Sequence, residues 1–202
     1  LPDLPLYPIV DPRGLITPLF DGWSIDFWIV PEEGNPLIPS KLDMVDQKLF
    51  KDGGLMVKTV AEKASLKLET TVEMVMNKIG PELEIRAKGS TDRQAGIVVS
   101  IRPYNPEGIQ FIETIAFDES KKTWSVNDST FLVSDKAPDR VVLSTYAEGD
   151  VFLKLDQESR EKSVECDIGL ANGAGVYNIR PGIEKEIRFR IPLGEELKNE
   201  FP

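Results

Sequence analysis

Four aromatic side chains are the residues of this sequence whose chemistry best suits contact with a ligand. They are the three tryptophans, Trp23, Trp28 and Trp124, and Tyr104. A flat aromatic face packs against the apolar C–H face of a sugar ring, although most large aromatic side chains are simply buried in a protein core. We therefore name Trp28, Tyr104 and Trp124 as candidate carbohydrate-binding residues, with core packing as the alternative for each.

The stretch around Trp28 alternates between apolar and polar side chains, as a half-buried strand does. Because successive side chains point to opposite faces of a strand, Trp23 lies on the face of Ile25 and Phe27, whereas Trp28 shares the other face with Asp26. The face that carries Asp26 is the more polar one. We therefore predict that Trp28 is partly exposed.

Side chains capable of acid–base or nucleophilic chemistry do not form a recognisable catalytic set. The chain has 34 Asp and Glu residues and no His, which excludes histidine-based triads and histidine-ligated metals. Acids paired across a cleft cleave glycosidic bonds, but surface or turn roles explain Asp21, Asp26, Glu32 and Glu33 better. Cys166 lies in an alternating run with no histidine to activate its thiol, which indicates a structural side chain. We predict no catalytic residue, no metal site and no cofactor.

Two short motifs resemble functional sites, but neither indicates a function for this chain. Asn127-Asp128-Ser129 matches an N-glycosylation acceptor, which we attribute to chance because the sequence shows no secretory signal. The run from Asn172 to Gly175 contains two glycines but lacks the Lys-Ser/Thr ending of a phosphate-binding loop. We predict a hairpin loop there.

The net charge and the composition of the chain limit the kinds of binding partner to expect. The formal net charge is −10, so phosphate-rich nucleic acids and anionic membrane surfaces are repelled at long range. No apolar run approaches the ~20 residues of a membrane-spanning helix, and the single cysteine gives no reason to expect an oxidising compartment. We therefore expect a cytoplasmic protein with no nucleic-acid or membrane partner.

The distribution of prolines and apolar residues predicts an all-β protein. Eight of the 15 prolines lie in the first 40 residues, where they forbid regular helix, and the apolar residues between them indicate an extended strap over 1–21. Further on, period-two runs separated by turn signals predict a sandwich of strands. The predicted strands cover 23–30, 66–76, 82–87, 97–102, 111–117, 123–126, 131–134, 141–146, 151–155, 164–170 and 187–191.

These runs predict one large antiparallel β-sandwich domain over residues 1–202. Parallel winding is disfavoured because no strong helical window separates the strands. A helix is expected to start within 193–198. Because the chain begins at Leu1 rather than Met, we expect a processed chain or a domain of a longer protein.

One longer motif resembles a known family. The run Ser100–Ile109 reads SIRPYNPEGI and is followed by Phe111–Ile112 and Trp124–Asn127. This pattern resembles the amino-terminal β-sandwich domain of amylo-α-1,6-glucosidase-like proteins, which are bacterial and archaeal relatives of glycogen-debranching enzymes. The segment Phe20–Trp28 is similar to the opening strand of that family. A structural corner accounts for the motif equally well, since Arg102 can offer its fork of donors to backbone carbonyls or to a partner acid.

The resemblance implies a supersandwich domain that precedes an (α/α)6 toroid carrying both catalytic acids. On this basis we expect a non-catalytic accessory domain of an α-glucan-processing glycoside hydrolase, with the C-terminal toroid of the same chain as its partner and α-glucan as a further candidate ligand. An autonomous carbohydrate-binding or lectin-like module is the alternative. A third hypothesis is that this chain is a hydrolase by itself.

Overall fold

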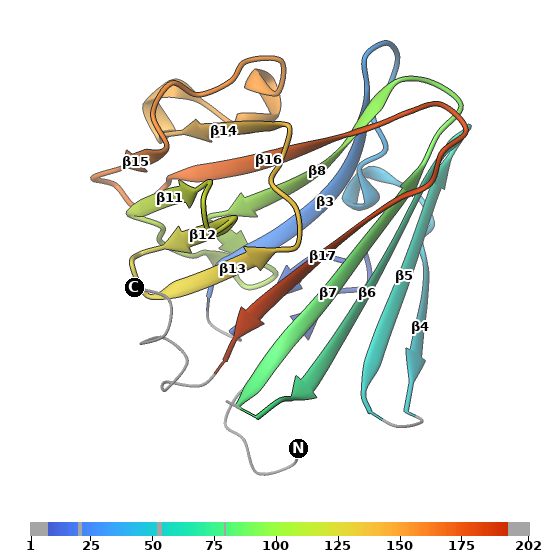
Figure 1. Ribbon diagram of the computed structural model, residues 1–202, viewed down its shortest axis with the longest axis horizontal. Coiled ribbons are helices and arrows are strands. Elements are labelled where there is room, and N and C mark those ends of the chain that lie inside the picture. The colour runs from blue at the N-terminus through green and yellow to red at the C-terminus, as the bar shows by residue number, and fades with distance from the viewer. Residues whose placement is uncertain (1–7, 20–21, 52–53, 79, 194–202) are drawn as a thin grey trace.

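The computed structural model describes residues 8–19, 22–51, 54–78 and 80–193. Its strands form two large antiparallel sheets that face each other across an apolar core (Figure 1). No α-helix occurs among the described residues, whose three short helical turns are of the 3-10 type. The prediction of an all-β antiparallel sandwich is therefore confirmed.

The smaller sheet has six strands, in the order β1-β2-β3-β8-β16-β14. They are β1 Ile9–Val10, β2 Ile16–Thr17, β3 Ser24–Pro31, β8 Ala95–Arg102, β16 Asn172–Ile179 and β14 Arg140–Ser144.

The larger sheet has nine strands, in the order β15-β11-β12-β13-β17-β7-β6-β5-β4, and β4 to β7 form a continuous meander (Figure 1). They are β15 Ser163–Glu165, β11 Thr114–Asp118, β12 Thr123–Val126, β13 Thr130–Ser134, β17 Lys185–Pro192, β7 Pro81–Ser90, β6 Leu66–Met76, β5 Met56–Lys63 and β4 Asp46–Phe50. A small hairpin, β9 Tyr104–Asn105 with β10 Gly108–Ile109, follows β8.

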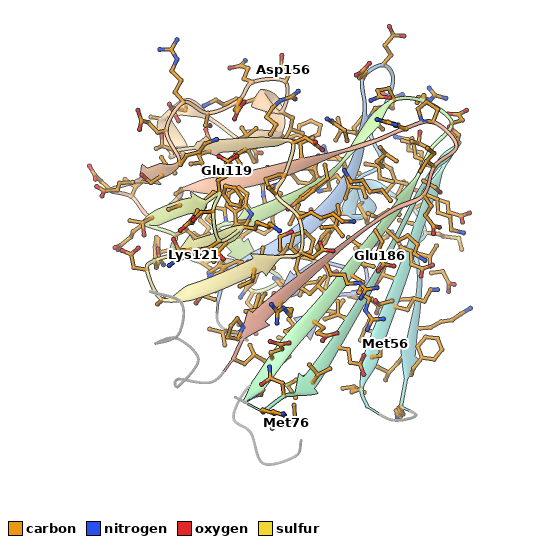
Figure 2. All side chains as sticks on the ribbon, viewed as in Figure 1. Met56, Met76, Glu119, Lys121, Asp156 and Glu186 are labelled. Atoms are coloured by element: carbon orange, nitrogen blue, oxygen red, sulfur yellow. The ribbon has the colours of Figure 1, made fainter. Side chains whose placement is uncertain are left out.

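Alternation builds the core between the sheets. In β3, Ile25, Phe27 and Ile29 point inward and are buried. The ring of Phe27 meets the edge of Phe189 from β17 at 5.8 Å, so the two sheets contact each other through aromatic side chains. On β6 the same alternation fades toward the end of the strand, where Met76 is 54% exposed (Figure 2).

The described part of the predicted strap joins the smaller sheet. Residues 8–19 fold back on themselves through β1 and β2, and β2 pairs with β3 opposite Ile25. Ile16 is completely buried, which explains why this proline-rich stretch carries so many apolar side chains. The rest of the strap, and nearly all of the helix expected within 193–198, lie outside the described residues.

Three local predictions were wrong. The segment 151–155 forms a 3-10 turn, η3 Val151–Lys154, and of 164–170 only the first two residues belong to a strand. The run from Asn172 to Gly175 starts β16 instead of forming a loop. Its glycines serve close packing: a Cβ built on Gly173 or Gly175 would lie 3.3 Å from the ring of Trp124.

A glycine on β8 marks another close approach, from which we predict a stability effect. A Cβ on Gly96 would lie 2.7 Å from Cγ1 of Val176, whose branched side chain has little rotamer freedom. We expect Gly96→Ala to lower the free energy of unfolding by about 1–2 kcal/mol, measured by urea denaturation. Gly54→Ala is the matched control, since its new Cβ meets only the end of the Glu73 side chain. Equal effects of the two variants would contradict the packing argument.

Candidate functional site

Polar and aromatic side chains gather on the outer face of the six-stranded sheet, away from the main core. Register places Ser24 of β3 opposite Arg102 of β8, and Asp26 opposite Ser100. All four are buried. A buried polar row on the outer face of a sheet requires a cover, because an antiparallel sheet ordinarily exposes such a face to water.

The cover is a segment after β14. It contains η2 Tyr146–Glu148 and η3 Val151–Lys154, whose coils lie above β14 at the upper left of Figure 1. The carboxylate of Asp150 caps η3 by accepting from the backbone N–H of Phe152 at 2.8 Å, and the side-chain oxygen of Asn172 accepts from that of Val151 at 2.8 Å. The first bond lies within the segment, and the second fixes it to β16 of the sheet. We call residues 146–154 the η2–η3 strap, or simply the strap from here on, as distinct from the amino-terminal strap predicted over 1–21.

Beneath the strap lies a second, smaller apolar cluster. The edge of Phe152 meets the Trp28 ring at a centroid distance of 5.6 Å. The cluster comprises Trp28, Ile38, Val98, Val142, Val151, Leu155, Ala174 and Val176. Trp28 is consequently only 4% exposed, and the prediction that it is partly exposed was wrong. The polar face of β3 is covered because 151–155 folds as a 3-10 turn across it.

Arg102 lies at the centre of the site and contacts an acid and two aromatic rings. One terminal nitrogen donates to Oδ1 of Asp150 at 2.8 Å and the other pairs with Oδ2, while the carbon of the guanidinium lies 5.5 Å from the Trp28 ring and 5.2 Å from that of Tyr104. Backbone carbonyls and a partner acid were the alternatives for Arg102, and the structure shows the acid. Burial acts to raise the pKa of Asp150, but hydrogen bonds from Arg102 and the Phe152 N–H outweigh it and hold that pKa below its ordinary value.

Asp26 is the buried acid of the site. It is 5% exposed, and burial raises its pKa to about 6, against the opposing effects of the Trp28 indole N–H and the Arg102 charge. The guanidinium is engaged by Asp150, so among the described residues Asp26 forms no ion pair. The assignment of Asp26 to the surface was therefore wrong.

The three candidate aromatics are not brought together. Trp28 and the half-buried Tyr104 flank Arg102 on the outer face of the six-stranded sheet. Trp124 instead lies in the main core, 1% exposed, with its ring 4.8 Å from that of Phe117. Trp28 and Trp124 are therefore separated by the sheet. The site around Arg102 also includes Asp26, Asp150 and Phe152, none of which the sequence reasoning named as a site residue.

A shallow hollow of about 220 Å³ lies beside the β12–β13 turn. Its lining includes Trp23, Gln110, Phe111 and Asn127. The side-chain amide of Asn127 donates to the Phe111 carbonyl at 3.1 Å and accepts from Glu113 N–H at 2.8 Å. The side chain of the sequon asparagine thus helps to hold this turn.

Other site types find little support in the described part of the chain. No cluster of three or more Cys, Asp or Glu with metal-binding geometry occurs there. None of its helical segments is long and apolar enough to cross a membrane. Cys166 is buried, as the structural assignment expects.

Comparison with known families and with curated proteins finds no match. Comparison with solved structures does. This chain aligns over 93% of its length with 30% of a bacterial glucoamylase in complex with acarbose, at a TM-score of 0.66 and 14% identity. A putative kojibiose phosphorylase from the human microbiome aligns over 84% of this chain and 22% of its own, at 0.44 and 9%. The chain spans less than a third of either protein, and it has the fold of a region of the glucoamylase.

Proposed function

We propose that this chain is a non-catalytic accessory domain of an α-glucan-processing glycoside hydrolase, which packs on a helical catalytic domain of the same polypeptide. The observation that carries the proposal is the fold match: nearly all of this chain corresponds to less than a third of a glucoamylase. A domain that forms such a minor part of an enzyme is suited to support the part that performs the reaction. An amylo-α-1,6-glucosidase-like parent is the finer proposal, which rests on the SIRPYNPEGI motif.

Exposed apolar side chains near the strap support a packing role. A Cβ on Gly169 would touch the ring of Phe111, and the backbone N–H of Tyr146 faces the thiol of Cys166, so these segments adjoin. Soluble monomers rarely gather large exposed apolar side chains unless a partner covers them. Phe111 (69% exposed), Tyr146 (65%) and Ile168 (52%) lie on these adjoining segments. We group with them Ile109 (64%), which is two residues before Phe111, and Leu153 (74%), which lies in η3 of the same strap as Tyr146, and call the five side chains the strap-end patch.

The motif residues support a role in shaping this end of the domain. The side-chain amide of Asn105 donates to the carbonyl of Gly22 at 3.1 Å, and its oxygen accepts from Glu107 N–H at 2.8 Å. Together with the Arg102–Asp150 pair, these bonds tie the β9–β10 hairpin and the strap to the sheet. In the proposed enzyme this rigid end would form part of the rim of the catalytic cleft.

The first experiment is the mass and sequence of the native polypeptide. The proposal predicts that a helical domain with paired candidate acids follows this chain. A native polypeptide that ends near Pro202 would overturn it and would leave a stand-alone glucan binder as the function to test.

A second experiment probes the strap-end patch within that longer polypeptide. Leu153→Glu should lower its melting temperature by several degrees, because it places a charge in the proposed domain contact, while the isolated 202-residue chain is expected to unfold at an unchanged urea concentration. Met44→Glu is the matched control, since Met44 is 85% exposed and lies just before β4, outside the patch. Equal effects of both variants in the longer protein would argue against docking through this patch.

An autonomous carbohydrate-binding module is the second candidate, favoured by the aromatic-lined hollow at Trp23 and Phe111. Its volume of about 220 Å³ is below the roughly 300 Å³ at which ligand sites usually begin. We therefore expect isothermal titration of the isolated chain with maltoheptaose to give no saturable heat at a Kd tighter than about 10 mM. Saturable binding that Phe111→Ala abolishes would instead establish the module.

A further inference from the structure

The outermost strands of the two large sheets differ in how much of their backbone is free to pair. Strands β1 and β15 are only two and three residues long. The free side of β14 is occupied by Ser159, whose backbone N–H donates to the carbonyl of Val141 at 2.9 Å and whose hydroxyl accepts from the N–H of Leu143 at 2.7 Å. Short strands and covered edges prevent unwanted strand pairing. Three of the four edges are protected in these ways.

Strand β4, at the end of the larger sheet, has neither form of protection. It is five residues long and lies at the right-hand edge of Figure 1, with no strand beyond it. Among the described residues, the backbone of 46–50 forms no hydrogen bond outside its pairing with β5. The N–H and C=O groups on the outer side of β4 are therefore available to another strand.

The sequence around β4 is complementary to itself when two copies run antiparallel. In the register centred on Gln47, each charged side chain lies opposite the other charge and each apolar side chain lies opposite an apolar one. The pairs are Asp46 with Lys48, Val45 with Leu49, and Met44 with Phe50. Because a two-fold axis passes through Gln47, every pair occurs twice.

The neighbouring registers do not match in this way. Opposite residues point to the same face of a sheet, so the register moves only in steps that keep this alternation. Centring on Lys48 places two lysines opposite each other and sets Asp46 against Phe50, whereas centring on Asp46 places two aspartates together. Like charges directly opposite are destabilising. The charges therefore select one register.

The apolar side chains that this register pairs are exposed in a single chain. Met44 is 85% exposed, Leu49 54% and Phe50 41%. A hollow of about 500 Å³ opens on the outer face of this part of the sheet, and its lining includes Met44, Asp46 and Lys48. The ring of Phe50 from a second copy, opposite Met44, would lie at the rim of this hollow.

Lys48 gains a counter-ion from the second copy. Within one chain it lies directly opposite Lys58 of β5. Lys58 pairs with Glu69 at 2.8 Å, whereas Lys48 has only a 3.5 Å contact with Asp46, whose side chain is 63% exposed. A lysine on an edge strand usually discourages pairing. Here the Asp46 carboxylate of the second copy would compensate its charge.

We propose that two copies of this chain associate by antiparallel pairing of their β4 strands in the register centred on Gln47. The two-fold axis closes the contact, so a third copy cannot add to it. The Phe111 and Ile168 side chains of the strap-end patch flank β11 and β15, at the other end of the larger sheet. The pairing leaves that patch free and is independent of the proposed function.

Concentration-dependent nuclear magnetic resonance of the 202-residue chain tests the association. Two five-residue strands bury less surface than a stable dimer needs, so we expect a Kd of about 0.1–1 mM. Translational diffusion should slow, and the amide signals of 44–50 should shift, between about 0.05 and 1 mM chain. At micromolar concentration the chains remain single, so stability measured on Met44 and Asp46 variants reports on the single chain.

Charge reversal tests the register. Asp46→Lys and Lys48→Asp each place like charges opposite each other and should weaken association at least about tenfold. The double variant restores opposite charges in the register centred on Gln47 but leaves like charges at the axis of both neighbouring registers. It should therefore associate with a Kd within about threefold of the wild type. An equimolar mixture of the two single variants should associate as well.

Asp156→Lys is the matched control, because it changes the net charge as much as Asp46→Lys and lies on the exposed loop after the strap (Figure 2). It should leave the Kd unchanged. Signals and diffusion that do not depend on concentration would overturn the proposal. Association that both single variants retain, that Asp156→Lys weakens equally, or that the double variant fails to restore would also overturn it.

Discussion

Asp26→Asn should raise the free energy of unfolding by about 2–3 kcal/mol at pH 7.5 and by less than about 1 kcal/mol at pH 4. The pKa of Asp26 rises from its ordinary 3.8 to about 6 because folding buries the carboxylate. The folded state therefore binds this proton more tightly than the unfolded state. The stability that results is present below pH 4 and is lost as the pH rises through 6, and asparagine removes this loss.

Urea denaturation of the wild type and the variant at pH 4, 5.5 and 7.5 measures the effect. At pH 7.5 the melting temperature should rise by about 5–10 °C. Asp156→Asn is the control, because Asp156 is exposed on the loop that follows the strap and its replacement should change little (Figure 2). A variant whose stability difference is the same at all three pH values would show that burial of the charge is not the cause.

Asp150→Ala should lower the free energy of unfolding by about 2–4 kcal/mol at pH 7.5. The substitution leaves the buried Arg102 guanidinium without its counter-ion and removes the cap of η3. Asp150→Asn keeps a capping oxygen and removes only the charge, so about half of the effect should remain. The cost stays below that of a fully buried pair, because the Asp150 side chain is 41% exposed and water can reach the site.

Two comparisons make this result specific. Asp46→Ala breaks an ion pair with Lys48 whose side chains are 63% and 65% exposed, and it should cost less than about 0.5 kcal/mol. Hydrogen exchange of the Val151 and Phe152 amides should accelerate in Asp150→Ala well beyond the change in global stability, because both amides belong to the strap. Unchanged exchange at these amides would mean that the pair does not hold the strap to the sheet.

The sheets could be predicted from the sequence because alternation is a local signal. Residues 66–76 and 82–87 show which side chains face inward, and a period of two leaves strand as the natural interpretation. The run 151–155 alternates too, but its structure is decided by the Asp150 cap and by Asn172, which comes from another strand. The period-two pattern of a short segment cannot indicate a partner that is distant in sequence.

The site was less predictable for the same reason. The sequence left backbone carbonyls and a partner acid as alternatives for Arg102, and it could not show which of the 34 acidic residues such a partner would be. Trp28 was expected near solvent because its strand face is polar, and only the strap that covers this face buries it. No local sequence pattern indicates that Asp26 is buried, because its burial results from the pairing of β3 with β8 and from the η2–η3 strap that covers this face.

The order of strands within the smaller sheet also bears on how the chain is made. The meander β4 to β7 pairs neighbour with neighbour, so it can form as soon as it is synthesised. Strand β3 is made before the meander, yet it pairs with β8, which follows the meander, with Phe27 opposite Val99. During synthesis the apolar run 23–30 therefore waits without its partner until the whole meander has emerged. We expect the closure of β3 onto β8, and that of β17 onto β7 across a still longer stretch of chain, to be slower than formation of the meander, and this interval leaves the nascent chain open to chaperones or to aggregation.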